Sequence, residues 1–124
     1  MKTTIIIARV LLGLILLVFG LNNFLQFLPM PEMSAEAGEF MGALAKAGYF
    51  FPIIAIVEII IGVLLLINKY TVLALVVLFP ILLNAFLFHL FLDIGGIGIA
   101  ALANILNIFL FITNKQKYSE ILQV

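Results

Sequence analysis

The chain has 124 residues, of which 66% are hydrophobic and 10% charged, and its formal net charge is zero. This composition lies well outside the range of ordinary soluble domains. The sequence contains no cysteine and a single histidine, His89, which excludes disulfides, thiolate metal sites and thiol-based redox chemistry carried by this chain. We therefore expect no metal site and no covalently bound cofactor, and a lipid bilayer rather than nucleic acid as the partner.

Four apolar runs predict membrane-spanning helices, because about 20 residues of α-helix cross the hydrocarbon core of a bilayer. They cover residues 5–28, 49–67, 70–92 and 94–113. The first run exceeds the apolar region of about 7 to 15 residues in a signal peptide, so we expect it to be retained. The predicted fold class is all-α: a polytopic membrane protein in which residues 1–124 form one domain, a four-transmembrane-helix bundle.

A short amphipathic helix is predicted for residues 34–47, between the first two spans. Ser34 can cap its start and Gly48 its end. Apolar residues recur at helical spacing on one face, and charged residues lie on the other. The apolar face comprises Met33, Ala37, Phe40, Met41 and Leu44. This helix is either an interfacial helix resting on lipid headgroups or a lid over a cavity.

The basic residues predict the orientation of the spans, because cytoplasmic loops are enriched in Lys and Arg. Of the six basic residues, only Lys46 lies in the loops on one side of the predicted bundle. The other five are Lys2, Arg9, Lys69, Lys115 and Lys117. We therefore predict a multi-pass protein of a bacterial-type inner membrane, with both termini in the cytoplasm and the 34–47 helix outside.

Small residues predict how the helices pack. Gly13 and Gly20 lie on one face of the first span, and Gly96, Ala100 and Ala103 give the fourth span a similar face. Such faces let membrane helices approach closely. We expect both spans to use them for helix contacts.

Two ionisable residues within the spans, Arg9 and Glu58, need a partner or access to water, because a charge at bilayer depth is costly otherwise. One interpretation is a structural ion pair between Arg9 and Glu58, which would fix the register of two helices. The other is that Glu58 lines a ligand or proton site. The sequence leaves both open.

A second polar set gathers in the outer half of the spans, among several phenylalanines. We interpret it as a ligand site for a small apolar or quinone-type molecule, although His89 can instead pair with Asp93, and phenylalanines often contact lipid. The predicted ligand-binding residues are Asn22, Asn23, Glu58, Asn84, His89 and Asn104, with Phe24 and Phe88 beside the ring. No catalytic residue can be assigned.

Several segments resemble the DoxX family of small four-helix membrane proteins. They are ARVLLG at residues 8–13, FGLN at 19–22, GYF at 48–50, VEIIIGVLLL at 57–66 and NAFLFH at 84–89. The resemblance implies a four-helix bundle with an arginine in the first helix and a glutamate in the second, here Arg9 and Glu58. It also implies an association with quinone-linked respiratory or thiosulfate-oxidising complexes.

The leading functional hypothesis is therefore an accessory subunit of a quinone-linked redox system, not an enzyme on its own, that binds its ligand in an outer-half cavity. Two alternatives remain: a small-solute transporter or channel coupled through Glu58, and a purely structural assembly subunit. The expected partners are another redox subunit or further copies of the same chain.

The orientation can be tested with single cysteines, because the natural sequence has none. In intact cells, an impermeant thiol reagent is expected to label Ala43→Cys, in the outer loop, and to leave Lys69→Cys unlabelled until the membrane is opened. The reverse labelling pattern would show that the bundle has the opposite orientation.

Overall fold

The computed structural model describes residues 1–29 and 32–118, and all regular structure in this part of the chain is helical. The helices are α1 (Lys2–Leu25), α2 (Ala35–Ala47), α3 (Phe50–Ile67), α4 (Thr71–Phe91) and α5 (Ile97–Thr113), with two 3-10 turns, η1 (Ile94–Gly96) and η2 (Lys115–Tyr118). Four segments are long and apolar enough to cross a membrane: α1, α3, α4 and Ile94–Thr113. The predicted all-α, four-span architecture is confirmed.

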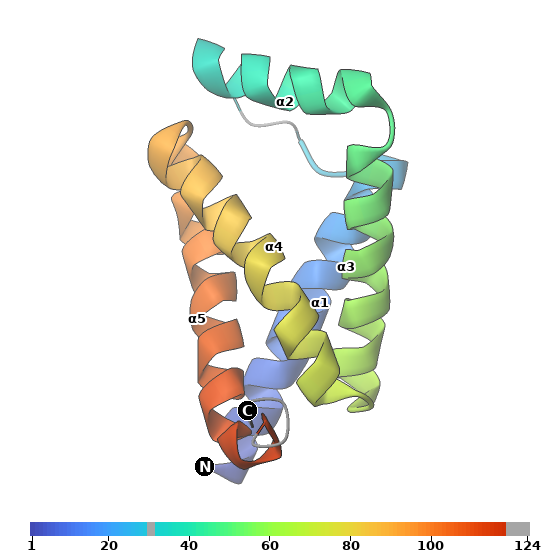
Figure 1. The fold of residues 1–124 in the computed structure, drawn as a ribbon, viewed down its shortest axis with the longest axis vertical. Helices are drawn as coiled ribbons and strands as arrows, with labels where there is room; N and C mark the ends of the chain where they lie inside the picture. The colour runs from blue at the N-terminus through green and yellow to red at the C-terminus, as the bar shows by residue number, and fades with distance from the viewer. Residues whose placement is uncertain (30–31, 119–124) are drawn as a thin grey trace, which may run out of the picture.

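Successive long helices run in opposite directions, so α1 begins and α5 ends at the same end of the bundle (Figure 1). We call this the terminal end. Helix α2 lies across the opposite end, the α2 end. Helix α1 packs mainly against α3, and α4 mainly against α5. These two pairs diverge toward the α2 end, with α4 and α5 on the left of Figure 1 and α1 and α3 on the right.

Helix boundaries differ from the predicted ones by up to three residues, and α1 shows why. It ends at Leu25 rather than at residue 28, because Gln26 adopts a left-handed conformation with φ 51°. The Asn22 side chain then accepts a hydrogen bond of 2.8 Å from the backbone N–H of Leu28. A polar side chain near the helix end thus offers the backbone an alternative to a further helical turn.

The predicted amphipathic helix is present as α2, and both of its caps are confirmed. The Ser34 hydroxyl accepts from the backbone N–H of Ala37 at 3.1 Å, and Gly48 has φ 85°. The same hydroxyl donates to the Leu92 carbonyl just after α4, at 2.7 Å. On the apolar face, Phe40 stacks on Phe88 of α4 with ring centroids 5.8 Å apart. Helix α2 is therefore fixed to α4 as well as joined to α3.

Helices α1 and α3 come into backbone contact at two glycines. A Cβ atom at Gly13 would lie 3.0 Å from the Gly62 carbonyl oxygen, and one at Gly62 would lie 2.9 Å from the Gly13 oxygen. Nearer the α2 end, a Cβ at Gly20 would lie 3.1 Å from the Ala55 oxygen. Real Cβ atoms essentially never come as close as 2.9 Å and rarely come as close as 3.0 or 3.1 Å, so these glycines set the register of α1 against α3.

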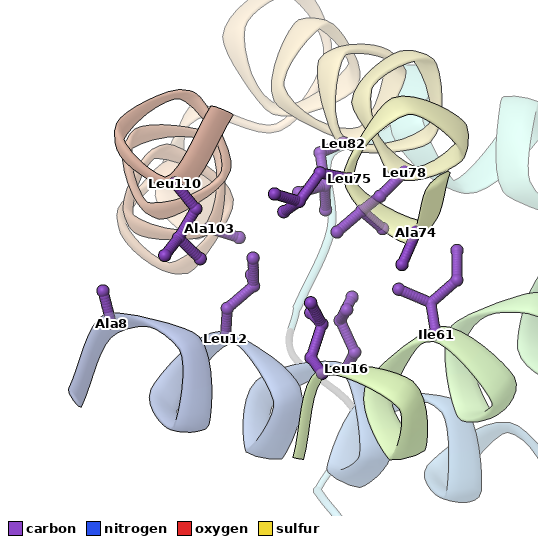
Figure 2. Packing of buried hydrophobic residues seen from close by; sticks show 11 residues of the cluster. Ala8, Leu12, Leu16, Ile61, Ala74, Leu75, Leu78, Leu82, Ala103 and Leu110 are labelled. Carbon is purple, nitrogen blue, oxygen red and sulfur yellow. The ribbon is translucent and has the colours of Figure 1, made fainter. Parts of the chain in front are cut away.

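The buried core draws on all four long helices, whose side chains point toward one another in Figure 2. It comprises Ala8, Leu12, Leu16, Ile61, Leu65, Ala74, Leu75, Leu78, Leu82, Ala103 and Leu110. On the four helices, the members nearest the α2 end are Leu16, Ile61, Leu82 and Ala103. The core therefore fills the terminal half of the bundle and stops near its middle.

The glycine contact predicts a matched pair of effects on stability. Gly62→Ala places a methyl group against the Gly13 carbonyl and is expected to lower the free energy of unfolding by about 1–3 kcal/mol, the usual cost of overpacking. Gly98→Ala, which meets nothing within 4 Å, serves as the control. Thermal unfolding in detergent measures both, and equal melting temperatures would contradict the close approach.

Candidate functional site

Beyond the core, on its α2 side, the inward faces of the helices are open. Leu12, Leu16, Phe19 and Asn23 follow one another on one face of α1, at helical spacing. Leu12 and Leu16 are 0% and 3% exposed, but Phe19 is 40% exposed and Asn23 is also exposed. An inward-facing phenylalanine with this exposure lacks a facing helix.

Helix α3 shows the same change along its inward face. Leu65 and Ile61 are buried, whereas Glu58 and Ile54, one and two turns closer to the α2 end, are only half-buried. Burial therefore falls at the same level as on α1, because the two helix pairs diverge there (Figure 1).

The inward face of α4 loses burial at the same level. Leu78 and Leu82 are buried, and Ala85 and His89, which continue the same face, are half-buried. We call the region between the core and α2 the open half of the bundle. Its lining includes Phe19, Asn23, Ile54, Glu58, Ala85 and His89. Sequence periodicity did not identify Phe19, Ile54 or Ala85 as lining residues. Periodicity predicts which face of a helix points inward, but not the level at which a neighbouring helix no longer covers that face.

Glu58 lies at the boundary between the core and the open half. Its Cβ is close to Gly20, where an added Cβ atom would be 3.3 Å away, so Glu58 begins in close contact with α1. Within residues 1–29 and 32–118, no hydrogen bond or ion pair involves the Glu58 carboxyl group. A half-buried carboxyl group without a described partner is the clearest functional feature of the bundle.

Arg9 binds the end of α3. Its Nη1 donates to the Leu65 carbonyl and, at 3.2 Å, to the Leu66 carbonyl. The last carbonyls of a helix lack partners within the helix, and a positive charge is favourable at that end. Arg9 therefore caps α3, a role that the sequence analysis did not foresee.

The predicted ion pair between Arg9 and Glu58 is wrong. The one ion-pair contact among the described residues joins His89 Nδ1 to Asp93 Oδ2, at 3.7 Å. Arg9 contacts Leu66, and Glu58 precedes Leu66 by roughly two helical turns, or about 12 Å at 1.5 Å per residue. The contact between Gly13 and Gly62 fixes this separation.

Two asparagines of α5 join it to α4. The Asn104 Nδ2 donates to the Leu82 carbonyl at 2.8 Å and to the Ala100 carbonyl at 2.9 Å. The Asn107 Nδ2 donates to the Leu75 carbonyl at 3.3 Å. Asn104, one of the predicted ligand-binding residues, therefore has no N–H hydrogen left to donate to a ligand, because backbone oxygens already use both.

His89 lies at the α2 end of α4 and packs on the start of the last span. Its Nδ1 is 3.1 Å from the Asp93 carbonyl oxygen, and a Cβ atom at Gly96 would lie 2.5 Å from its Cε1. The pairing of His89 with Asp93, one of the two interpretations above, is present. The other ring nitrogen, Nε2, has no partner among the described residues.

Asn84 lies outside the predicted site. It is exposed and shares a face of α4 with Leu73, Val77 and Phe91, which are 59%, 43% and 74% exposed. This face points away from the core, toward lipid. The prediction that Asn84 converges with Asn104 is therefore wrong, because Pro80 and Asn84 follow the outer side of α4.

The remaining predicted residues lie near the α2 end. Phe88 is half-buried under Phe40, whereas Phe24 is 52% exposed at the end of α1. Asn22 binds the Leu28 N–H, and the Asn23 Nδ2 donates to the Phe19 carbonyl at 3.2 Å. Both asparagines thus serve the end of α1 through these bonds.

Two shallow apolar grooves lie in the terminal half and do not reach Glu58. One, of about 290 Å³, is lined by Thr4, Ile7, Ala8, Leu11, Ile105, Leu106 and Phe109. The other, of about 350 Å³, is lined by Val76, Phe79, Ile108, Phe111 and Ile112. Their walls suit lipid acyl chains.

The separation of Arg9 from Glu58 predicts additive effects. Arg9→Leu removes the cap on α3, Glu58→Leu removes an unpaired carboxyl group, and the double variant should show the sum of the two changes in unfolding free energy within about 0.5 kcal/mol. Thermal unfolding in detergent gives all three values. If the double variant loses less unfolding free energy than the sum of the two single losses, Arg9 and Glu58 do form an ion pair.

Residues 4–90 match the family DoxX. No curated protein and no solved structure matched the chain. The family match runs from the first turn of α1 almost to the end of α4 and includes both Arg9 and Glu58. Since it covers more than half of the sequence, the chain belongs to the DoxX family of membrane proteins.

Proposed function

We propose that this DoxX protein binds a small apolar or quinone-type molecule in the open half of the bundle and acts as an accessory subunit of a quinone-linked redox system. The observation that carries the proposal is the loss of burial along the inward faces of α1, α3 and α4, at the level of Glu58. A space between apolar walls that holds a few polar groups is typical of small-molecule sites.

The composition of the open half supports an aromatic or isoprenoid ligand. Phe19 and Phe88 present aromatic surface, and Ile54 and Ala85 present aliphatic surface. Such a ligand dissolves in the bilayer and reaches the space between the diverging helix pairs from the side. Helix α2, held by Ser34 and Phe40, then covers the end of the site.

The side chains of this protein indicate which part of a redox function it can supply. It has no cysteine and one histidine, so its own side chains offer binding groups rather than electron carriers. In this proposal a partner subunit carries the redox chemistry, and the bundle supplies or retains the quinone. The lysine distribution supports an orientation with α2 on the outer face of a bacterial-type inner membrane and both termini in the cytoplasm.

Filling the open half tests the proposal. Ala85→Phe adds a ring on the inward face of α4 without touching the buried core and should reduce the quinone that copurifies with the protein about tenfold, equivalent to about 1.4 kcal/mol. Leu83→Phe, two residues away on the exposed face, is the control and should retain the wild-type amount. Mass spectrometry of a solvent extract gives the ratio of quinone to protein.

Three outcomes would contradict the proposal. Equal retention by Ala85→Phe and wild type would place the ligand elsewhere. Solute flux in liposomes that depends on Glu58, without any bound quinone, would favour a transporter. An extract without quinone, combined with an obligate partner protein, would favour a structural assembly subunit.

A further inference from the structure

The larger of the two apolar grooves lies between α4 and α5, and we call it the α4–α5 groove. Its volume is about 350 Å³, and its lining is entirely apolar: Val76 and Phe79 of α4, and Ile108, Phe111 and Ile112 of α5. Phe79, Ile108 and Ile112 are exposed, so the groove faces the lipid. An apolar groove of this kind can pack against a hydrocarbon chain of the bilayer.

Tyr118 holds the turn η2 against this groove. Its ring stacks on Phe111, a residue of the groove wall, with ring centroids 4.0 Å apart and ring planes 9° from parallel. Tyr118 is buried. Since Lys115 and Lys117 belong to the same short turn, they lie at the terminal end of the groove rather than extending away from it.

Lys115 continues the groove face of α5. It follows Ile108 by seven residues and Ile112 by three, spacings that bring residues to the same side of a helix or a 3-10 turn. Its side chain is exposed and forms no ion pair with the described residues. Lys69, also exposed, lies two residues before α4 begins. Both helices of the groove therefore have a lysine beside their terminal ends.

Positive charge is in excess at the terminal end of the bundle. Four exposed lysines lie there: Lys2, Lys69, Lys115 and Lys117. In the described part of the chain, Glu58 lies near the middle of the bundle, and the other acidic residues lie at the α2 end: Glu32, Glu36, Glu39 and Asp93. The sequence adds a single acidic residue after the lysines, Glu120. Lysines clustered beside a membrane surface attract anionic lipid head groups.

We propose that the α4–α5 groove and η2 form a binding site for an anionic phospholipid. One acyl chain lies in the groove and the head group lies beside Lys115, with Lys69 adding positive charge from the other wall. An anionic phospholipid matches both the apolar groove and the lysines, whereas a zwitterionic one also brings a positive group, which the lysines repel. This site is in the terminal half, separate from the open half, and does not depend on quinone binding.

The head-group preference can be measured by native mass spectrometry in detergent. The protein is mixed with equal amounts of a phosphatidylglycerol, which is anionic, and a phosphatidylcholine with the same acyl chains. Wild type is expected to bind about fivefold more of the anionic lipid, the scale of one lysine beside a membrane surface. Lys115→Gln should lower this ratio about threefold or more. Lys2→Gln removes the same charge from α1 at the same end and should keep the wild-type ratio.

A matched pair of α5 variants tests the groove. Ile108→Phe adds a ring at the wall of the α4–α5 groove and is expected to lower the bound phosphatidylglycerol about threefold. Ile105→Phe makes the same change three residues away, in the groove between α1 and α5, and should bind the wild-type amount. Thermal unfolding shows whether both variants keep the fold.

Three results would overturn the proposal. The first is equal binding of the two lipids by wild type. The second is an equal loss of preference in Lys2→Gln and Lys115→Gln, which would show diffuse attraction to the terminal end. The third is equal lipid binding by folded Ile108→Phe and Ile105→Phe, which would place the chain outside the α4–α5 groove. If Ile108→Phe does not fold, the lysine pair decides between a site and diffuse attraction.

Discussion

The backbone contact between α1 and α3 at Gly13 and Gly62 is the constraint on which the rest of the bundle depends. Two helices that touch through their backbones cannot slide past one another without a clash, so their register is fixed along their whole length. This register brings Arg9 to the last carbonyls of α3 and places Glu58 beside Gly20. One charged group is thereby bound to the backbone, and the other is left at the edge of the open half.

The second consequence is uneven closure of the bundle. Close packing along α1 and α3, and amide bonds between α5 and α4, hold each pair together, while the core between the pairs fills only the terminal half. Helix α2 joins the pairs at the other end through Ser34 and Phe40. The open half therefore lies between the buried core and helix α2.

Most polar groups inside the bundle serve the backbone. Arg9, Asn104 and Asn107 all donate to helix carbonyls, because a membrane interior supplies no water to satisfy either side. An ionised carboxylate cannot take this role, since carbonyls also accept, and the Glu58 carboxyl group has no hydrogen bond among the described residues.

The sequence by itself determined the four spans, the amphipathic helix with its caps, and the glycine face of α1, because hydropathy, periodicity and capping are local properties of the chain. It also identified Arg9 and Glu58 as the charges that need an explanation. Only the tertiary structure decided their partners, since a pairing across helices depends on register to within one turn, and sequence fixes depth only approximately. Asn84 and Asn104 are similar in type and depth, yet Asn84 lies on the exposed face of α4 and Asn104 on the face of α5 that packs against α4. Which face of a helix is covered depends on where the neighbouring helices lie.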